Sequence, residues 1–131
     1  MPKEILIVDD EPDVVVPIQF LMEQQGYLVM IAERGEDALD LIYHYKPDLV
    51  ILDIMLPGID GFEVCESVRL DPNYRDVKIM FLTARGREVN IAKGLALGAD
   101  AYITKPYSND ELVAKVKELL EKNHEETEEK S

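Results

Sequence analysis

Three carboxylates, a hydroxyl and an amine follow or end short apolar runs in this 131-residue sequence: Asp9, Asp10, Asp53, Thr83 and Lys105. Carboxylates held close together repel one another and partly protonate unless a cation neutralises them. All the candidate ligand atoms are oxygens, which favours a hard ion such as Mg²⁺ over zinc. Asp53 then suits a nucleophile, Lys105 a positive charge for a transferring group, and Thr83 a donor to a phosphoryl oxygen. Phosphoryl transfer requires these parts.

The apolar runs recur at similar intervals and are mostly continuous, as expected for strands buried on both faces of a parallel sheet. They cover 5–8, 28–31, 49–52, 79–82 and 101–104. Helical periodicity marks the stretch that ends at Gly26, then 36–45, 62–70 and 88–97, and a last helix capped by Ser108 or Asn109. This alternation predicts an α/β fold: a doubly wound, five-stranded parallel sheet of order 2-1-3-4-5 with five helices, a three-layer sandwich of flavodoxin-like type.

The predicted strand order brings the polar groups together. Open α/β sheets bind ligands at the carboxyl ends of their strands, beside the point where the strand order reverses. The strand over 28–31 is an edge and ends in Ala32, whereas the other four strands are neighbours. Their polar ends should therefore converge on one shallow basin. Taken singly, each residue also has a structural explanation: the Asp pair and Thr83 as helix caps, Asp53 as part of a turn, and Lys105 as a surface lysine.

Composition narrows the classes of function. The formal net charge of −13 argues against nucleic acid as a partner, because phosphate binding needs clustered Lys and Arg. The single cysteine, Cys65, cannot form an intramolecular disulfide, and no apolar run has the length of a membrane span or of a signal peptide. We expect a cytoplasmic protein without a membrane partner, with one domain over 1–122 and an acidic, flexible tail over 123–131.

Four segments are similar to the motifs of bacterial response regulator receiver domains, and the similarity extends from about residue 3 to residue 120. They are ILIVDDEPD at 5–13, LVILDIMLPGIDGFE at 49–63, IMFLTARG at 79–86 and GLALGADAYITKPY at 94–107. The resemblance implies a two-component signalling domain that accepts a phosphoryl group onto Asp53 from a sensor histidine kinase or a phosphotransfer protein. It implies that Asp9 and Asp10 organise Mg²⁺, or Mn²⁺ as a substitute, together with Asp53 and the backbone carbonyl of Met55.

The resemblance also implies a conformational switch. Lys105 would pair with Asp53 at rest and with a phosphoryl oxygen afterwards, and the Lys105–Pro106 peptide bond would be cis. Thr83 would move toward the phosphoryl group, and Tyr102 would turn from an exposed to a buried position in the space that Thr83 leaves. Such a switch is a two-state element that a local change of charge biases.

The implied output surface consists of the helix over 88–97, the strand over 101–104 and the last helix, and its expected partner is a downstream effector protein. Receivers joined to winged-helix DNA-binding domains often pair through charges on this surface. Only part of that charge set is present, because the corresponding positions hold Asp100 then Ala101, Ile91, and Lys115. The sequence therefore predicts a monomer or a weak dimer.

Two alternatives to a stand-alone receiver remain open. The chain could be the receiver fragment of a longer DNA-binding or enzymatic response regulator. It could also be a phosphohydrolase with an Asp nucleophile, although such enzymes carry a second acid two residues after the nucleophile, where this chain has Met55. We expect no enzyme in the usual sense: the domain would catalyse only its own phosphorylation and dephosphorylation.

Overall fold

The apolar runs form one parallel sheet in the computed structural model, which describes residues 2–84 and 86–130. In this part of the chain the strands are β1 (Glu4–Val8), β2 (Leu28–Ala32), β3 (Leu49–Leu52), β4 (Lys78–Thr83) and β5 (Ala101–Thr104). The helices are α1 (Pro12–Gln24), α2 (Gly35–Tyr45), α3 (Gly61–Leu70), α4 (Glu88–Ala96) and α5 (Asn109–Lys130), with a 3-10 turn, η1 (Pro72–Tyr74). The strand order is β2-β1-β3-β4-β5, which confirms the predicted doubly wound fold.

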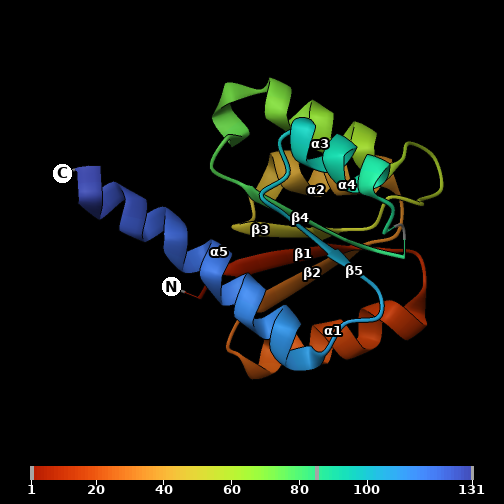
Figure 1. The fold of residues 1–131 in the computed structure, drawn as a ribbon, viewed down its shortest axis with the longest axis horizontal. Coiled ribbons are helices and arrows are strands. Elements are labelled where there is room, and N and C mark those ends of the chain that lie inside the picture. The colour runs from red at the N-terminus through yellow and green to blue at the C-terminus, as the bar shows by residue number, and fades with distance from the viewer. Residues whose placement is uncertain (1, 85, 131) are drawn as a thin grey trace.

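Helices cover both faces of the sheet, with α1 and α5 on one face and α2, α3 and α4 on the other (Figure 1). Successive side chains of a strand point to opposite faces. Ile5 and Ile7 of β1 accordingly pack in one core cluster with α1 and α5, whereas Leu6 and Val8 pack in the other with α2 and α3. Burial on both faces explains why the central strands are continuously apolar.

The edge strand β2 differs from the central strands because one of its sides has no neighbour. Leu28 is 55% exposed and Ile31 is 37% exposed, whereas β1 and β3 are almost fully buried. The predicted strand over 28–31 ends one residue early, since Ala32 also pairs with Val8 of β1. β2 contributes no polar side chain to the edge where the other strands end.

Local chemistry fixes the ends of the helices. Gly26, at φ +90°, follows α1 and confirms the predicted stop. Ser108 Oγ accepts the Glu111 amide at 3.0 Å, so Ser108 caps α5. The sequence predicts fraying from about Glu121, but α5 continues to Lys130, because Glu and Lys are good helix formers.

Residues 123–130 of the predicted tail belong to α5, and the flexibility of the tail stays a prediction. The side chains of 122–130 lie outside the described residues, as does Ser131. None of the helices in the described part of the chain has an apolar stretch long enough to cross a bilayer.

Candidate functional site

The carboxyl ends of four neighbouring strands meet at one edge of the sheet. Asp9 follows β1, Asp53 follows β3, Thr83 ends β4 and Lys105 follows β5. Backbone hydrogen bonds extend the sheet to these residues: the Asp53 amide donates to the Val8 carbonyl at 3.0 Å, and the Lys105 amide donates to the Thr83 carbonyl at 2.9 Å. We call Asp9, Asp53, Thr83 and Lys105 the basin. The predicted convergence of these strand ends is confirmed.

Asp9 is the most constrained carboxylate of the basin. Its side chain is buried, its Oδ1 accepts the Glu11 amide at 2.9 Å, and its Oδ2 lies 3.8 Å from Lys105 Nζ. Burial raises the pKa of Asp9 above its usual value, and the charge of Asp53 raises it further. The Glu11 amide and the charge of Lys105 act in the opposite direction without cancelling this rise. The ionised form of Asp9 is therefore destabilised, and a nearby cation would stabilise it.

Asp53 is held by the first residues of the loop that follows β3. It is 9% exposed, and its Oδ1 accepts the Ile54 amide at 2.8 Å. The Gly61 amide donates to the Ile54 carbonyl at 2.9 Å, which closes the loop onto the start of α3. A Cβ at Gly61 would collide with the Asp53 carbonyl, so the helix can approach this closely only with glycine at that position. Asp53 is thus held by its own bond to the Ile54 amide and by the close packing of Gly61 against its carbonyl.

Lys105 precedes a cis peptide bond to Pro106, as the resemblance implies. Its ion pair in the structure joins Asp9 and not Asp53, the resting partner that the resemblance implies. Asp9 is the more deeply buried of the two carboxylates, and a charge attracts its counterion more strongly where the local dielectric is lower. Lys105 thus pairs with Asp9, the more buried of the two carboxylates.

The remaining predicted residues lie around the basin at different depths. Asp10 is exposed and contributes, with Val15 and Val16 of α1, to a groove of about 200 Å³. The side chain of Met55 is 56% exposed. Tyr102 is half-buried in β5 and lies on the α3–α4 side of the sheet, where its ring centroid is 5.6 Å from that of Phe81.

The oxygens of the basin fit the ion that the sequence predicts. Among the described side chains, those of 2–84 and 86–121, no three His, Cys, Asp or Glu lie close enough to hold a metal by themselves. Mg²⁺ does not need such a cage, because it keeps several waters and binds through one or two carboxylates. Asp9 and Asp53 repel each other, and a divalent cation would relieve that repulsion. These two carboxylates could therefore hold Mg²⁺, and Asp10 and the Met55 carbonyl stay predicted ligands.

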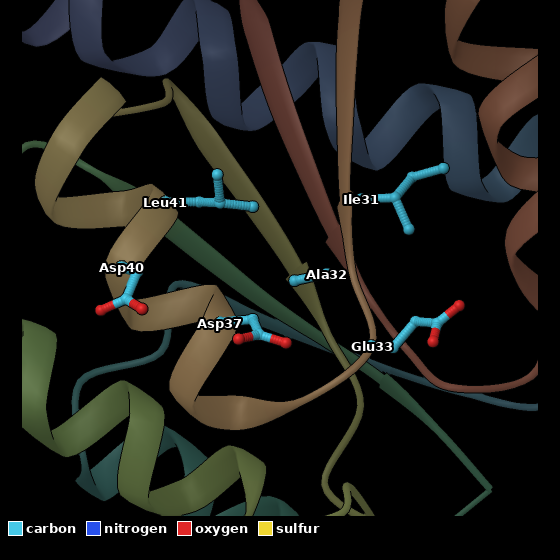
Figure 2. Close-up of a pocket in the computed structure, with 6 residues that line it drawn as sticks. All are labelled: Ile31, Ala32, Glu33, Asp37, Asp40 and Leu41. Atoms are coloured by element: carbon cyan, nitrogen blue, oxygen red, sulfur yellow. The ribbon is translucent and has the colours of Figure 1, made fainter.

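A second, larger hollow of about 460 Å³ lies between β2 and α2 (Figure 2). Its lining residues are Ile31, Ala32, Glu33, Asp37, Asp40 and Leu41. Asp37 and Asp40 project from α2, and Glu33 follows β2 (Figure 2). We call Glu33, Asp37 and Asp40 the acidic hollow. The described residues that line it include no base or cation, so it lacks the charge balance of the basin.

Sequence reasoning missed two groups near the basin. Burial raises the pKa of Tyr107, and the charge of Asp9 raises it further, so the phenol lies within electrostatic reach of Asp9. Its position two residues after Lys105 was the available signal. The carboxylate of Glu36 accepts the amide of Ile59 in the loop after β3. No rule of spacing links residues 23 positions apart on different elements.

Comparison with known proteins agrees with this arrangement. The family model of the response regulator receiver domain matches residues 5–117. The chain is 40% identical to a proposed response regulator from Chloroflexus aurantiacus J-10-fl, over 92% of this chain and 98% of that one, with a TM-score of 0.87. It is 34% identical to a CheY-like response regulator receiver domain protein from Methanospirillum hungatei JF-1, over 96% and 99% of the two chains, with a TM-score of 0.88.

A third similar structure is the BeF3-activated N-terminal receiver domain of RstA from Klebsiella pneumoniae, with 34% identity over 90% of this chain and 98% of that one and a TM-score of 0.84. Receiver domains are signalling domains of two-component systems, bind Mg²⁺ for phosphorylation and interact with histidine kinases and effectors. The match covers the strand ends that form the basin and ends within α5, at residue 117. The chain therefore belongs to the response regulator receiver domain family.

Proposed function

We propose that Asp53 accepts a phosphoryl group from a phosphohistidine on a sensor histidine kinase or phosphotransfer protein. The observation that carries the proposal is the convergence of Asp53, Asp9 and Lys105 at adjacent strand ends, with the charge of Asp53 acting on buried Asp9. A carboxylate oxygen of Asp53 forms the new O–P bond as the N–P bond breaks, and the leaving imidazole nitrogen takes up a proton. The product is an aspartyl phosphate on Asp53 and a free histidine on the partner.

The other basin residues supply charge and position. Mg²⁺, held by Asp9, Asp10, Asp53 and the Met55 carbonyl, would neutralise the phosphoryl oxygens when bound, and Mn²⁺ could replace it. Lys105 leaves Asp9 for a phosphoryl oxygen, which its compact ammonium on a flexible stem permits. Thr83 donates its hydroxyl to another of these oxygens. The domain thus catalyses only its own phosphorylation and dephosphorylation.

The output of this reaction is a change of the surface formed by α4, β5 and α5. Movement of Thr83 toward the phosphoryl group opens space for Tyr102, which is half-buried beside Phe81 and close to Gly94 of α4. A downstream effector protein binds the altered surface. The protein acts in the cytoplasm as a monomer or weak dimer, and its net charge of −13 disfavours nucleic acid as a partner of this chain.

Intact mass after incubation with acetyl phosphate tests the proposal. Wild type should gain one phosphoryl group only with Mg²⁺ present, and Asp53→Asn should gain none. Asp37→Asn, in the acidic hollow, is the matched control and should behave as wild type. An adduct that persists in Asp53→Asn places the acceptor elsewhere. The absence of any wild-type adduct, together with no binding of beryllofluoride, would eliminate the phosphorylation switch.

A further inference from the structure

The first turn of α2 holds the loop that follows β3. Glu36 is the second residue of α2, and its Oε1 accepts the backbone amide of Ile59 at 2.6 Å. Its Oε2 accepts from Arg34 Nη2 at 2.9 Å. In a closed β-turn, the amide of the fourth residue bonds the carbonyl of the first. The bend before Ile59 instead receives its acceptor from a side chain of another element.

Two glycines show how closely these segments approach. Gly58 has φ +77°, a conformation that favours glycine, and a Cβ there would collide with the Glu36 carboxylate. A Cβ at Gly35 would collide with the Ile59 carbonyl. The contact is therefore specified from both sides: the loop bends at Gly58 to receive the carboxylate, and α2 begins with Gly35 where the loop passes.

This loop, residues 53–60, carries the groups that we propose to bind Mg²⁺. Its first residue is Asp53, and the Met55 carbonyl lies four residues before Ile59. The bond from the Gly61 amide to the Ile54 carbonyl closes the two ends of the loop, and the bond from the Ile59 amide to Glu36 holds the loop against α2. We infer that Glu36 is a positioning residue for Mg²⁺: its bond to Ile59 fixes the path of the loop that carries Asp53 and Met55. This inference rests on the proposed function.

The charge of Glu36 contributes to this role. The Ile59 amide lowers the pKa of Glu36, and the bond from Arg34 lowers it further, so the carboxylate is ionised when the site works. A hydrogen bond to an ionised acceptor is shorter and stronger than one between neutral groups. Without this acceptor, the loop between Ile54 and Ile59 gains conformational freedom. Part of the free energy of Mg²⁺ binding is then used to order the loop, so the affinity for Mg²⁺ falls.

Calorimetric titration with Mg²⁺ alone tests the inference. Glu36→Ala should raise the dissociation constant about tenfold, the lower end of losses seen when a group that orients a metal ligand is removed. The Mg²⁺ concentration for half-maximal phosphorylation by acetyl phosphate should rise by the same factor. The rate at saturating Mg²⁺ should stay within about twofold of wild type, because the nucleophile itself is unchanged. Hydrogen exchange of the Ile59 amide should accelerate.

Three variants separate the effect of the bond between Glu36 and the Ile59 amide from the effects of net charge and of the neighbouring ion pair. Glu36→Gln keeps an acceptor oxygen without the charge and should lie closer to wild type than to Glu36→Ala. Asp37→Ala removes a charge from the same turn, and Arg34→Ala removes the neighbouring ion pair; both should leave Mg²⁺ affinity unchanged. If Glu36→Ala proves unstable, Glu36→Gln and the Ile59 exchange rate decide the question.

Three results would overturn the role of Glu36. The first is an unchanged Mg²⁺ affinity in Glu36→Ala while wild type binds and is phosphorylated, and this result leaves the proposed function intact. The second is an equal loss of affinity in Glu36→Ala, Glu36→Gln and Asp37→Ala, which would assign the effect to net charge. The third is a wild type that neither binds Mg²⁺ nor is phosphorylated, which removes the proposed function as well.

Discussion

The basin and the acidic hollow both lie toward the carboxyl ends of the strands and both contain several carboxylates, but they differ in burial and in charge balance. In the basin, Asp9 is 3% exposed and Asp53 is 9% exposed, and Lys105 lies 3.8 Å from Asp9. In the acidic hollow, Asp37 and Asp40 project from a surface helix beside the edge strand β2 (Figure 2). The hollow has a volume of about 460 Å³, whereas the basin contains Asp9, whose pKa is raised by burial and by the charge of Asp53.

This difference shows that acidity alone does not make a site for phosphoryl chemistry. The charge of a solvated carboxylate is stabilised by water and screened by salt, so it gains little from a specific cation. A buried carboxylate beside a second one is destabilised until a cation binds, and that energy can be used for binding and orientation. Topology creates the distinction, because β1, β3, β4 and β5 are neighbours while β2 is the edge.

The largest expected difference between the two regions is in Mg²⁺ binding. Asp9→Asn removes a proposed ligand charge from the basin and should weaken Mg²⁺ by at least about tenfold. Phosphorylation by acetyl phosphate at low Mg²⁺ should slow in parallel. Asp37→Asn removes one charge from the acidic hollow and should change neither quantity. Calorimetry with Mg²⁺ and intact mass over time measure both. Equal losses in the two variants would mean that general acidity attracts the ion and would contradict the comparison.

A smaller difference is expected in stability without metal. In EDTA, Asp9→Asn should increase the free energy of unfolding, because burial and the charge of Asp53 both disfavour the ionised form of Asp9. Asn keeps an oxygen for the Glu11 amide. Asp40→Asn in the acidic hollow should change stability by less than about 0.5 kcal/mol. Urea denaturation at neutral pH provides the values. A destabilised Asp9→Asn would show that the Lys105 pair outweighs the strain.

The sequence sufficed for the fold and for the members of the basin, because both follow from short-range patterns. Continuous apolar runs such as 49–52 indicate buried parallel strands, and the strand order then determines which ends meet. Asp53 and Lys105 could be placed in this way without any side-chain geometry. The helical continuation of α5 over 123–130 was not predicted, since a polar stretch without periodic apolar residues gives no amphipathic signal even when its residues favour helix.

The pairings within the site could not be predicted, because they depend on distances between elements. Lys105 pairs with Asp9 in the structure, and the sequence cannot rank two nearby carboxylates by burial. The bond from Ile59 to Glu36 depends on the path of a loop around Gly58, which no periodicity describes. Contacts of this kind emerge only once the helices have been placed on the sheet.

The smallest expected effect is on the pH dependence of stability and concerns two neighbours on α2. Glu36 contacts the loop of the basin, and Asp37 lines the acidic hollow. The Ile59 amide lowers the pKa of Glu36 from its usual 4.5, so its ionised form stabilises the fold above that pH, and the stabilisation is lost as the pH falls through the lowered value. The stability of wild type should therefore approach that of Glu36→Gln on acidification from about pH 7 to about pH 3. Asp37→Asn should retain this acid-dependent loss, because the bond from Ile59 to Glu36 remains. Urea denaturation at several pH values measures these differences. A gap between wild type and Glu36→Gln that stays constant across this range would mean that the Glu36 carboxylate gains nothing from Ile59, and that the loop of the basin is held by its own residues alone.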